Sequence, residues 1–383
     1  MNPSEDDIVL KLLHTADWHL GRKFRSFDED ANLKLSRARL EVIERIFNEA
    51  ERHQVDAVLC AGDLFDEPQP GREWVDGLLD ALKKRTWAHR PVFLLPGNHD
   101  PIEPDSVWLD PRFRKNLPEG VHVVEAAKEY PLVNGCVLWA VPCESRAGQL
   151  DPTSRIPKRA EGDERVRIGL VHGSTFDAPN AQTNFPIARD AVLDRGLDYL
   201  AIGDTHGFRF IPPDRTHPPT IYPGTPEATA FDEKDPGSVA IVFVTRQRRA
   251  MVNPRRVAAW DWEEVSVSSI AELRQLATRQ DLKTRVLRLH VDLRLPAPEL
   301  DEAEQLLERL AGTEARHGAV GVLDLQRHCL ELDVSNVEEW SRALPSVLQA
   351  TVTKLRSAAE DPLRRPAAQR ALFHLFRSTR KAS

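Results

Sequence analysis

Five short polar signatures constrain this chain more than any other feature of its sequence. Each signature follows a short apolar run that predicts a buried strand, and each supplies oxygen or nitrogen donors and no sulfur. They are Asp17-Trp18-His19, Gly62-Asp63-Leu64-Phe65-Asp66, Gly97-Asn98-His99-Asp100, Val171-His172-Gly173 and Gly203-Asp204-Thr205-His206. Open α/β sheets bind ligands beyond the carboxyl ends of their strands. The pattern therefore predicts two metal ions at one edge of a sheet, in a site suited to cleaving a phosphate ester.

The amino-terminal region alternates strands with helices. Apolar runs at residues 8–14, 55–60 and 91–95 predict strands, and residues 33–54 carry apolar side chains at helical spacing. This alternation indicates a layered α/β domain, which we assign to residues 8–250. We place a seam between domains near residues 246–254. Further strands are expected at residues 121–124, 136–141, 166–172, 199–202 and 239–244.

Two smaller segments follow. Residues 267–335 form a small α+β unit, because residues 287–295 alternate apolar and polar side chains with the period of a half-exposed strand and a helical stripe follows. Residues 337–383 form a helical and basic tail, whose apolar stripe is interrupted by Pro345 and lies outside any obvious core. We expect this tail to dock onto a partner protein.

The bulk composition excludes several classes of protein. The 383 residues correspond to about two to three domains. The net charge of −7 argues against a protein that coats nucleic acid with a wholly basic surface, although a local basic surface is compatible with it. The four cysteines form no C-x-x-C pair, which favours reduced thiols, and no apolar run reaches the ~20 residues of a bilayer span. We expect a cytoplasmic protein without a membrane segment.

The donor types suit hard divalent cations. Asp17 and His19 stand two residues apart and project together wherever extended geometry persists, and the same spacing relates Asp204 and His206. The two carboxylate oxygens of Asp63 make it a candidate to bridge two ions. Two further signatures add a neutral amide oxygen and an imidazole, from Asn98 and His172.

The series of signatures resembles the calcineurin-like metallophosphoesterases. Within them it is most similar to the SbcD-type DNA-repair nucleases, which work with SbcC-type coiled-coil ATPases. The segments that carry this resemblance are His14-Thr15-Ala16-Asp17-Trp18-His19-Leu20-Gly21-Arg22, Gly62-Asp63-Leu64-Phe65-Asp66 and Tyr222-Pro223-Gly224-Thr225. The resemblance implies a layered β-sandwich flanked by helices, with a small α+β capping domain and a helical carboxy-terminal tail.

The resemblance also implies roles for the site residues. One metal ion would take Asp17, His19, Asp63 and His206, and the other would share Asp63 and add Asn98, His172 and Asp204. His99 matches the catalytic histidine that stabilises or protonates the leaving group, and Asp100 would orient it. The cofactor would be two divalent ions, which stabilise both the attacking and the leaving oxygen. We expect Mn²⁺, with Mg²⁺, Fe²⁺ or Zn²⁺ as alternatives.

The last signature departs from the family pattern. The family usually has G-H-x-H, and this chain has Gly203-Asp204-Thr205-His206. Aspartate can replace histidine as a ligand for a hard ion. We expect Asp204 to be a ligand that alters the metal preference, and the alternative is an impaired second metal site.

For each of three residues in or near the signatures, the sequence allows two interpretations. We expect His14 to be a packed or supporting histidine, and Asp66 to be a loop or supporting carboxylate rather than a metal ligand. Trp18 could stack on a nucleobase or pack beneath the metal site.

Two basic clusters are candidates for contact with DNA phosphates. Arg22, Lys23 and Arg25 follow the first signature, and Arg112 and Arg114 follow the third. The alternative for the first cluster is solvated loop charge.

Three functions compete on these observations. The leading hypothesis is a Mn²⁺-dependent DNA nuclease, exo or endo, in a DNA repair or DNA-defence complex with an SbcC-type ATPase. The second is a phosphoesterase acting on small molecules, and the third is a non-catalytic scaffold for the ATPase. The expected partners are DNA and the ATPase, with a homodimer as a further expectation and no membrane.

Overall fold

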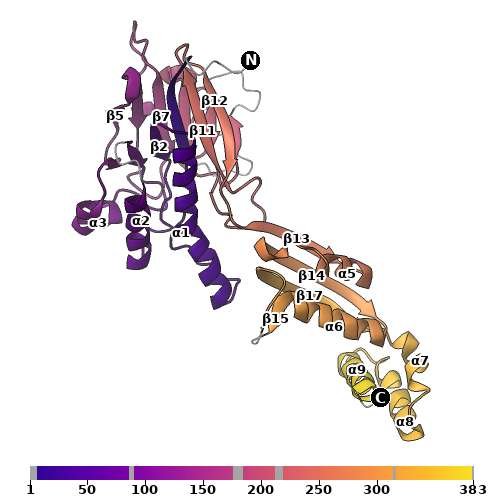
Figure 1. The fold of residues 1–383 in the computed structure, drawn as a ribbon. Coiled ribbons are helices and arrows are strands. Elements are labelled where there is room, and N and C mark those ends of the chain that lie inside the picture. The colour runs from indigo at the N-terminus through magenta and orange to yellow at the C-terminus, as the bar shows by residue number, and fades with distance from the viewer. Residues whose placement is uncertain (1–6, 86–89, 176–183, 212–218, 314–315, 382–383) are drawn as a thin grey trace. The chain divides into compact units, whose positions relative to one another are not determined.

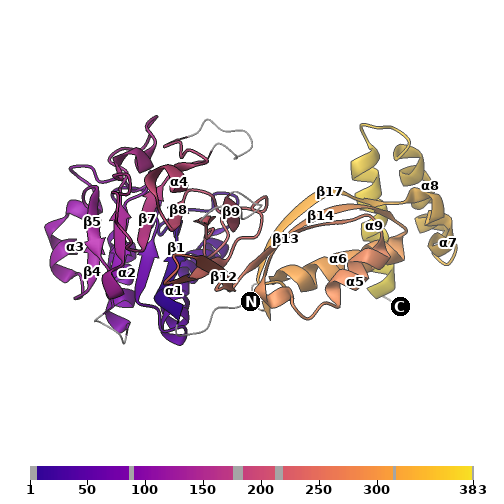
Figure 2. The same ribbon diagram turned by 90° about the horizontal axis from the view of Figure 1, so that it is seen from above.

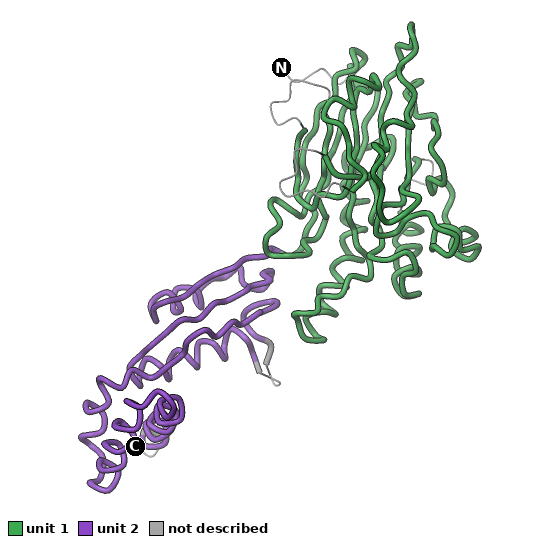
Figure 3. The backbone as a smooth tube through the Cα atoms, turned by 180° about the vertical axis from the view of Figure 1, so that it is seen from behind, with its two compact units in different colours: residues 1–260 green, residues 261–383 purple. Residues whose placement is uncertain are grey.

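The computed structural model describes residues 7–85, 90–175, 184–211, 219–313 and 316–381. The chain forms two compact units, residues 1–260 and residues 261–383, which Figure 3 colours separately. None of the helices in these described ranges has the length and apolarity that crossing a bilayer requires.

The first unit contains two six-stranded sheets within its described residues (Figure 1). One sheet has the order β12 (Ala250–Arg256), β11 (Ser238–Thr245), β1 (Ile8–Thr15), β2 (Ala57–Cys60), β3 (Val92–Leu94) and β4 (Val121–Val123). The other has the order β5 (Lys128–Pro131), β6 (Val137–Ala140), β7 (Arg167–His172), β8 (Tyr199–Gly203), β10 (Thr220–Tyr222) and β9 (Arg209–Ile211).

The two sheets pack face to face. Leu12 and Leu59 from the first sheet share a fully buried core with Leu138 and Ile168 from the second. On its other face the first sheet is covered by α1 (Glu29–Arg52) and α2 (Arg72–Lys84), through a core that includes Leu13. On its other face the second sheet packs against segments that include η4 (Pro152–Arg155) and α4 (Ala191–Arg195). This arrangement confirms the expected layered sandwich flanked by helices (Figure 2).

Local sequence signals fix the ends of the longest helix. The side chain of Asp28 accepts a hydrogen bond from the backbone N–H of Ala31 and so caps α1, which begins four residues before the predicted start at residue 33. Other short helices among the described residues of this unit are η2 (Val107–Leu109), α3 (Pro111–Asn116) and η3 (Val133–Gly135).

The expected seam at residues 246–254 is mostly strand. β12 pairs antiparallel with β11 along its whole length, so the first unit continues to Trp260. The sequence did not predict this strand, because its second half, which includes Pro254, is exposed and polar. Such a composition is tolerated at the edge of a sheet, where a strand needs partners on one side only.

The second unit contains a parallel sheet of β13 (Asp261–Val267), β14 (Arg285–Leu295) and β17 (Val322–Leu332), with β14 in the middle. Every apolar residue of the predicted alternation in β14 is buried, in a core formed with α5 (Ile270–Ala277) and α6 (Ala297–Ala311). Gly312 ends α6 at a positive φ of 82°. The other short elements are η5 (Leu282–Thr284), β15 (Gly312–Thr313), β16 (Arg316–His317) and η6 (Val334–Asn336).

The tail forms three helices, α7 (Val337–Ser341), α8 (Ser346–Ala358) and α9 (Arg365–Lys381). Its apolar stripe does not lie outside a core, as the sequence suggested. Val352, Leu372 and Phe376 are buried in the same cluster as the apolar face of β14. The tail is therefore part of the second unit, because the sheet and its two long helices leave apolar surface that the tail covers.

Candidate metal centre

The five signatures meet at one edge of the first unit. β1, β2 and β3 are mutually parallel, and so are β7 and β8, so their carboxyl ends share a direction within each sheet. The loops after β1 and β2 run side by side: Asp17 N–H donates to the Gly62 carbonyl at 3.0 Å, and His19 N–H donates to the Asp63 carbonyl at 3.0 Å. Side chains from distant parts of the sequence are thereby held by backbone bonds.

Four of the predicted ligands have left-handed backbone conformations. Asp17, His19, Asp63 and Asp204 have φ angles of 55°, 45°, 52° and 109°. Residues other than glycine rarely adopt such values, which cost about 1–3 kcal/mol each and cluster at functional sites. The surrounding loops hold these residues in conformations that aim their side chains at one small volume.

Glycine is required beside the ligands. A Cβ atom on Gly62 would lie 2.2 Å from His172 Nδ1, and one on Gly97 would lie 2.1 Å from Asp63 Oδ1. Gly62 also has a φ of +93°. The signatures contain these glycines because the backbone approaches the ligand side chains more closely than any side chain allows.

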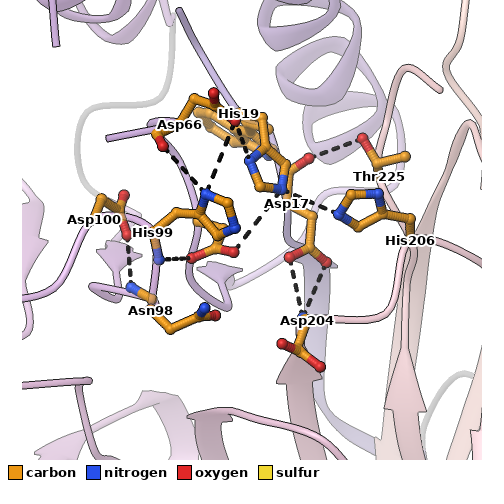
Figure 4. Close-up of polar contacts among 12 residues, drawn as sticks. Asp17, His19, Asp66, Asn98, His99, Asp100, Asp204, His206 and Thr225 are labelled. Atoms are coloured by element: carbon orange, nitrogen blue, oxygen red, sulfur yellow. Dashed lines mark hydrogen bonds and ion pairs between the residues drawn. The ribbon is translucent and has the colours of Figure 1, made fainter. Parts of the chain in front are cut away.

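Asp17, His19 and His206 form a first group of donors. One ligand atom from each lies within 4.8 Å of the others. The Nε2 atoms of His19 and His206 face each other at 3.1 Å (Figure 4).

The hydrogen bonds of these two imidazoles fit a cation. Nδ1 of His19 lies 3.0 Å from Asp66 Oδ1, and Nδ1 of His206 lies 2.5 Å from Glu233 Oε1. A carboxylate accepts and cannot donate, so each Nδ1 carries the hydrogen, and each ring presents a lone pair at Nε2 whenever it is neutral. Two lone pairs at 3.1 Å repel unless a cation is bound between them. The donor set therefore matches a divalent metal ion, which this arrangement would hold through both Nε2 atoms and Asp17.

Asp17, Asp63 and His172 form a second group, again within 4.8 Å. Nδ1 of His172 lies 2.8 Å from the Ala61 carbonyl oxygen, so Nε2 points into the site. Asn98 Oδ1 lies 2.7 Å from that Nε2, and Asp204 Oδ1 lies 3.9 Å from it.

Asp63, a member of the second group, also approaches the first. Its Oδ2 atom is 3.9 Å from Nε2 of His19 and 3.4 Å from Nε2 of His172. Both distances suit a carboxylate that contacts an ion on either side. The predicted ligands thus lie close together: Asp17 belongs to both groups, Asp63 approaches a histidine of each, and Asn98 and Asp204 approach His172.

Burial and neighbouring charges shift the pKa values of the histidines in the site. Burial lowers the pKa of His19 to about 4, so this imidazole is neutral and ready to bind a metal. Burial acts in the same direction on His172, but the carboxylates of Asp63, Asp17 and Asp204 outweigh it and raise the pKa of His172 to about 10. Without metal, a proton on Nε2 of His172 therefore occupies the side of the ring that a cation would take.

The pKa values of the carboxylates are shifted in opposite directions. Burial raises the pKa of Asp17 to about 7, and the neighbouring carboxylates reinforce this effect. Burial also acts to raise the pKa of Asp63, but the imidazoles of His172 and His19 outweigh it and hold that pKa below its ordinary value. Burial raises the pKa of Asp204. Three carboxylates at close range repel one another, and a pair of divalent cations would relieve this repulsion.

His99 stands at the rim of the site with 42% of its side chain exposed. Its backbone N–H donates to Asp63 Oδ1 at 2.9 Å, and its Nδ1 lies 3.1 Å from the Asp66 carbonyl oxygen. The ring packs edge-on against His19, with 4.8 Å between ring centroids. An exposed imidazole beside the donor groups can exchange a proton with a bound substrate.

Asp100 does not occupy the place that the sequence assigned to it. Its buried carboxylate accepts backbone N–H bonds from Gly97 at 2.7 Å, Leu64 at 2.9 Å and Phe65 at 3.0 Å. It therefore joins the second and third signatures and does not orient the His99 ring. The carboxylate nearest to that ring belongs to Asp66, 3.9 Å from His99 Nδ1. Backbone N–H groups at two tight turns need an acceptor, and Asp100 supplies it.

Two buried residues in and beside the first signature have packing roles. His14 is fully buried, and its Nδ1 lies 2.8 Å from the Tyr199 hydroxyl. Trp18 is also buried, which favours packing over stacking on a base, and its indole N–H donates to Thr15 at 2.8 Å.

The basic candidates differ in how they are held. Lys23, Arg25 and Arg112 are exposed. Arg22 is half-buried, with Nη1 3.5 Å from Asp66 Oδ1. Arg114 is also exposed, but its guanidinium donates to the Trp108 carbonyl at 2.8 Å and pairs with Glu125 at 2.9 Å.

Sequence reasoning missed two residues that hold the ligand loops in place. The buried guanidinium of Arg39 donates to the carbonyl oxygens of Trp18 at 2.8 Å and of Glu227 and Ala228 at 3.0 and 2.8 Å. A charged residue on the apolar face of α1 was the available signal. The other is Glu233, which lies in a polar loop without any periodicity, so no pattern pointed to it.

Comparison with known proteins agrees with this geometry. The family model for calcineurin-like phosphoesterases matches residues 10–208, which include every predicted metal ligand. The chain belongs to this family. Calcineurin-like phosphoesterases use divalent metal ions, and the clustered histidines and carboxylates of this phosphoesterase fit that use.

This phosphoesterase is similar in sequence to several bacterial and archaeal proteins. The SbcD component of the nuclease SbcCD of Bacillus subtilis is 31% identical over 299 residues, covering 68% of this chain and 70% of the relative. The uncharacterized metallophosphoesterase YhaO of the same organism is 26% identical over 247 residues, covering 62% of this chain and 58% of the relative. The DNA double-strand break repair protein Mre11 of Methanosarcina mazei is 28% identical over 250 residues, covering 62% of this chain. The match spans 37% of that Mre11.

Proposed function

We propose that this phosphoesterase is a Mn²⁺-dependent DNA nuclease that acts with a coiled-coil SbcC-type ATPase. The observation that carries the proposal is the pair of adjoining donor groups that share Asp17, with Asp63 close to a histidine of each group and His99 at their rim. Two metal ions bound there would stabilise the attacking and leaving oxygens of a phosphodiester.

The side chains would divide the work. Asp17, His19, Asp63 and His206 would hold one ion, and Asp63, Asn98, His172 and Asp204 would hold the other. The imidazole of His99 would stabilise or protonate the leaving oxygen, because it is exposed and held from behind by the carbonyl of Asp66. Oxygen and imidazole donors without thiolate suit Mn²⁺.

Two features support DNA as the substrate. Relatives similar over 68% and 62% of this chain are named as part of a nuclease and as a double-strand break repair protein, respectively. The exposed Lys23 and Arg25, in the loop after the first signature, and the exposed Arg112, in α3 after the third signature, carry positive charge. Such residues would contact backbone phosphates without reading sequence.

The second unit would serve assembly. We propose that residues 267–335 act as a capping domain and that residues 337–383 dock the ATPase. Support for an ATPase partner comes from the relatives named as the SbcD component of SbcCD. Although much of the tail stripe is buried, Val347 remains 76% exposed and Leu363 93% exposed. These two side chains would contact the partner.

Cleavage assays test the enzymatic proposal. We expect the purified chain with Mn²⁺ to cut labelled single- or double-stranded DNA, and we expect a His99→Ala variant to lose about 10²–10⁴-fold in rate while binding Mn²⁺ normally. A His374→Ala variant is the matched control, because this histidine is exposed on α9. Equal DNA cleavage by wild type and His99→Ala would contradict the assigned role.

A small diester separates the alternatives. Hydrolysis of bis-p-nitrophenyl phosphate with DNA left intact, in the presence of the ATPase, would favour a small-molecule phosphoesterase. Cleavage of neither substrate, with two Mn²⁺ ions bound, would favour a scaffold.

The partner is tested by co-purification with an SbcC-type ATPase. We expect a Val347→Ser/Leu363→Ser variant to lose the complex with its thermal unfolding unchanged, because both side chains are exposed. Leu33→Ser, at a 68% exposed position of α1, is the control. Undiminished co-purification of the tail variant would reject this docking surface.

A further inference from the structure

We propose that Glu233 is a positioning residue that sets the tautomer of His206 and so makes this histidine a metal ligand. The proposal rests on the metal-dependent part of the proposed function and adds to it a residue outside the five signatures. Glu233 lies 27 residues after His206, in the loop that precedes β11.

The contact between the two side chains is close and sheltered. Glu233 Oε1 lies 2.5 Å from His206 Nδ1, and only 9% of the Glu233 side chain is exposed. Thr229 Oγ1 lies 3.0 Å from the same nitrogen. A carboxylate that accepts from Nδ1 leaves Nε2 as the lone-pair nitrogen, and Nε2 is the atom that faces His19 at 3.1 Å.

Glu233 is itself held from its own loop. Its Oε2 atom accepts the backbone N–H of Thr229 at 2.8 Å, and its Oε1 atom accepts the Thr229 hydroxyl. Both oxygens of the carboxylate therefore have fixed donors. The rigid acceptor leaves the His206 ring one hydrogen-bonding choice, with the hydrogen on Nδ1.

This geometry makes the Glu233→Gln variant unusually informative. The backbone N–H of Thr229 cannot reverse its polarity, so the amide oxygen of Gln must take the place of Oε2. The amide NH₂ then faces Nδ1 of His206 and donates to it. The hydrogen of the imidazole must move to Nε2, where it blocks metal binding.

The first readout is the tautomer. Chains labelled with ¹⁵N-histidine are measured by long-range ¹H–¹⁵N NMR without metal, in alkaline buffer where the imidazole is neutral, and the His206 signals are assigned with a His206→Gln variant. We expect the hydrogen on Nδ1 in the wild type and on Nε2 in Glu233→Gln. A role confined to packing would not move this hydrogen.

The second readout is Mn²⁺ binding followed by calorimetry. We expect Glu233→Gln to lower the affinity for one of the two Mn²⁺ ions by about 10–100-fold. This is the range observed when a residue that supports a metal ligand is removed. Asp232→Asn removes the same charge from the exposed neighbouring position and should leave both ions unchanged. Glu233→Asp, which keeps an acceptor, should retain the hydrogen on Nδ1.

The outcomes are separable from those of the DNA assays. A hydrogen that stays on Nδ1 in Glu233→Gln, or Mn²⁺ affinities equal to those of the wild type, would overturn the proposal. Failure of the wild type to cleave DNA, with the tautomer and the two ions as expected, would reject the nuclease and leave the role of Glu233 intact.

Discussion

The backbone N–H of Asp204 donates to both carboxylate oxygens of Asp17, at 3.0 and 3.2 Å. This bond joins the loop after β8 in one sheet to the loop after β1 in the other (Figure 4). Because the donor belongs to the main chain, a substitution at position 204 leaves the support of Asp17 in place. The contribution of the Asp204 side chain to metal binding can therefore be measured by itself.

An Asp204→Asn variant should bind the second Mn²⁺ ion about 10-fold or more weakly, because an amide donor lacks the charge of a carboxylate. The first ion should bind as before. Asparagine also tolerates the left-handed φ of 109° at this position, so the fold should be retained. Metal titration by calorimetry checks this prediction, and unchanged occupancy of two ions would show that Asp204 is not a ligand.

Above about pH 6.5, the stability of the metal-free chain should fall as pH rises towards 10. Asp17, with a pKa raised from 3.8 to about 7, and His172, with a pKa raised from 6.5 to about 10, both bind a proton more tightly in the folded chain than in the unfolded chain. Their stabilising contributions are complete below 3.8 and 6.5 and are lost as pH rises towards 7 and 10, respectively.

Mn²⁺ should reverse this loss, because the ions replace the two protons. The increase in Tm on adding Mn²⁺ should therefore be larger at about pH 8.5 than at about pH 6. Thermal unfolding with and without Mn²⁺ measures it. An increase that shrinks with rising pH would contradict the assigned shifts.

A Gly62→Ala variant should lose metal binding, because its Cβ would lie 2.2 Å from Nδ1 of His172 and displace the ring. Gly135→Ala is a matched control: its φ of +74° is also left-handed, but no atom lies within 4 Å of the added Cβ. We expect the control to lose about 1–2 kcal/mol of stability and to keep both ions. Equal Mn²⁺ binding by the two variants would show that the contact with His172 does not matter.

A Leu372→Ala variant should destabilise the second unit by about 2–5 kcal/mol, because this fully buried side chain lies in its core. Leu363→Ala, at a 93% exposed position, should change stability by less than about 0.5 kcal/mol. Chemical denaturation of the full chain measures both effects. Little loss of stability in Leu372→Ala would mean that the tail is not part of this core.

Several features of the fold were readable from local sequence. The apolar runs before the signatures predicted β1, β2 and β3, because strands buried on both faces have continuous apolar residues. The helix at residues 33–54 was predicted from its stripe, but its start depended on the cap at Asp28. β12 escaped prediction, because an edge strand can be polar wherever it faces solvent.

The boundary of the tail was not readable in the same way. An apolar stripe states only that a helix buries one face, and not what covers it. From the sequence we expected a partner protein to cover this stripe. In the structure, Leu372 and Phe376 pack in the core of the second unit, whereas Leu363 remains exposed.

The sequence by itself determined which donors the site contains, because the five signatures carry the residue types and the glycines that metal binding requires. Only the tertiary structure decided how those donors are supported. Asp100 was expected to orient His99 and instead accepts three backbone N–H bonds, while Glu233 reaches His206 across 27 residues of chain. The reason is physical: ligand identity is a property of single residues, whereas a hydrogen bond between distant loops depends on the path of the backbone between them.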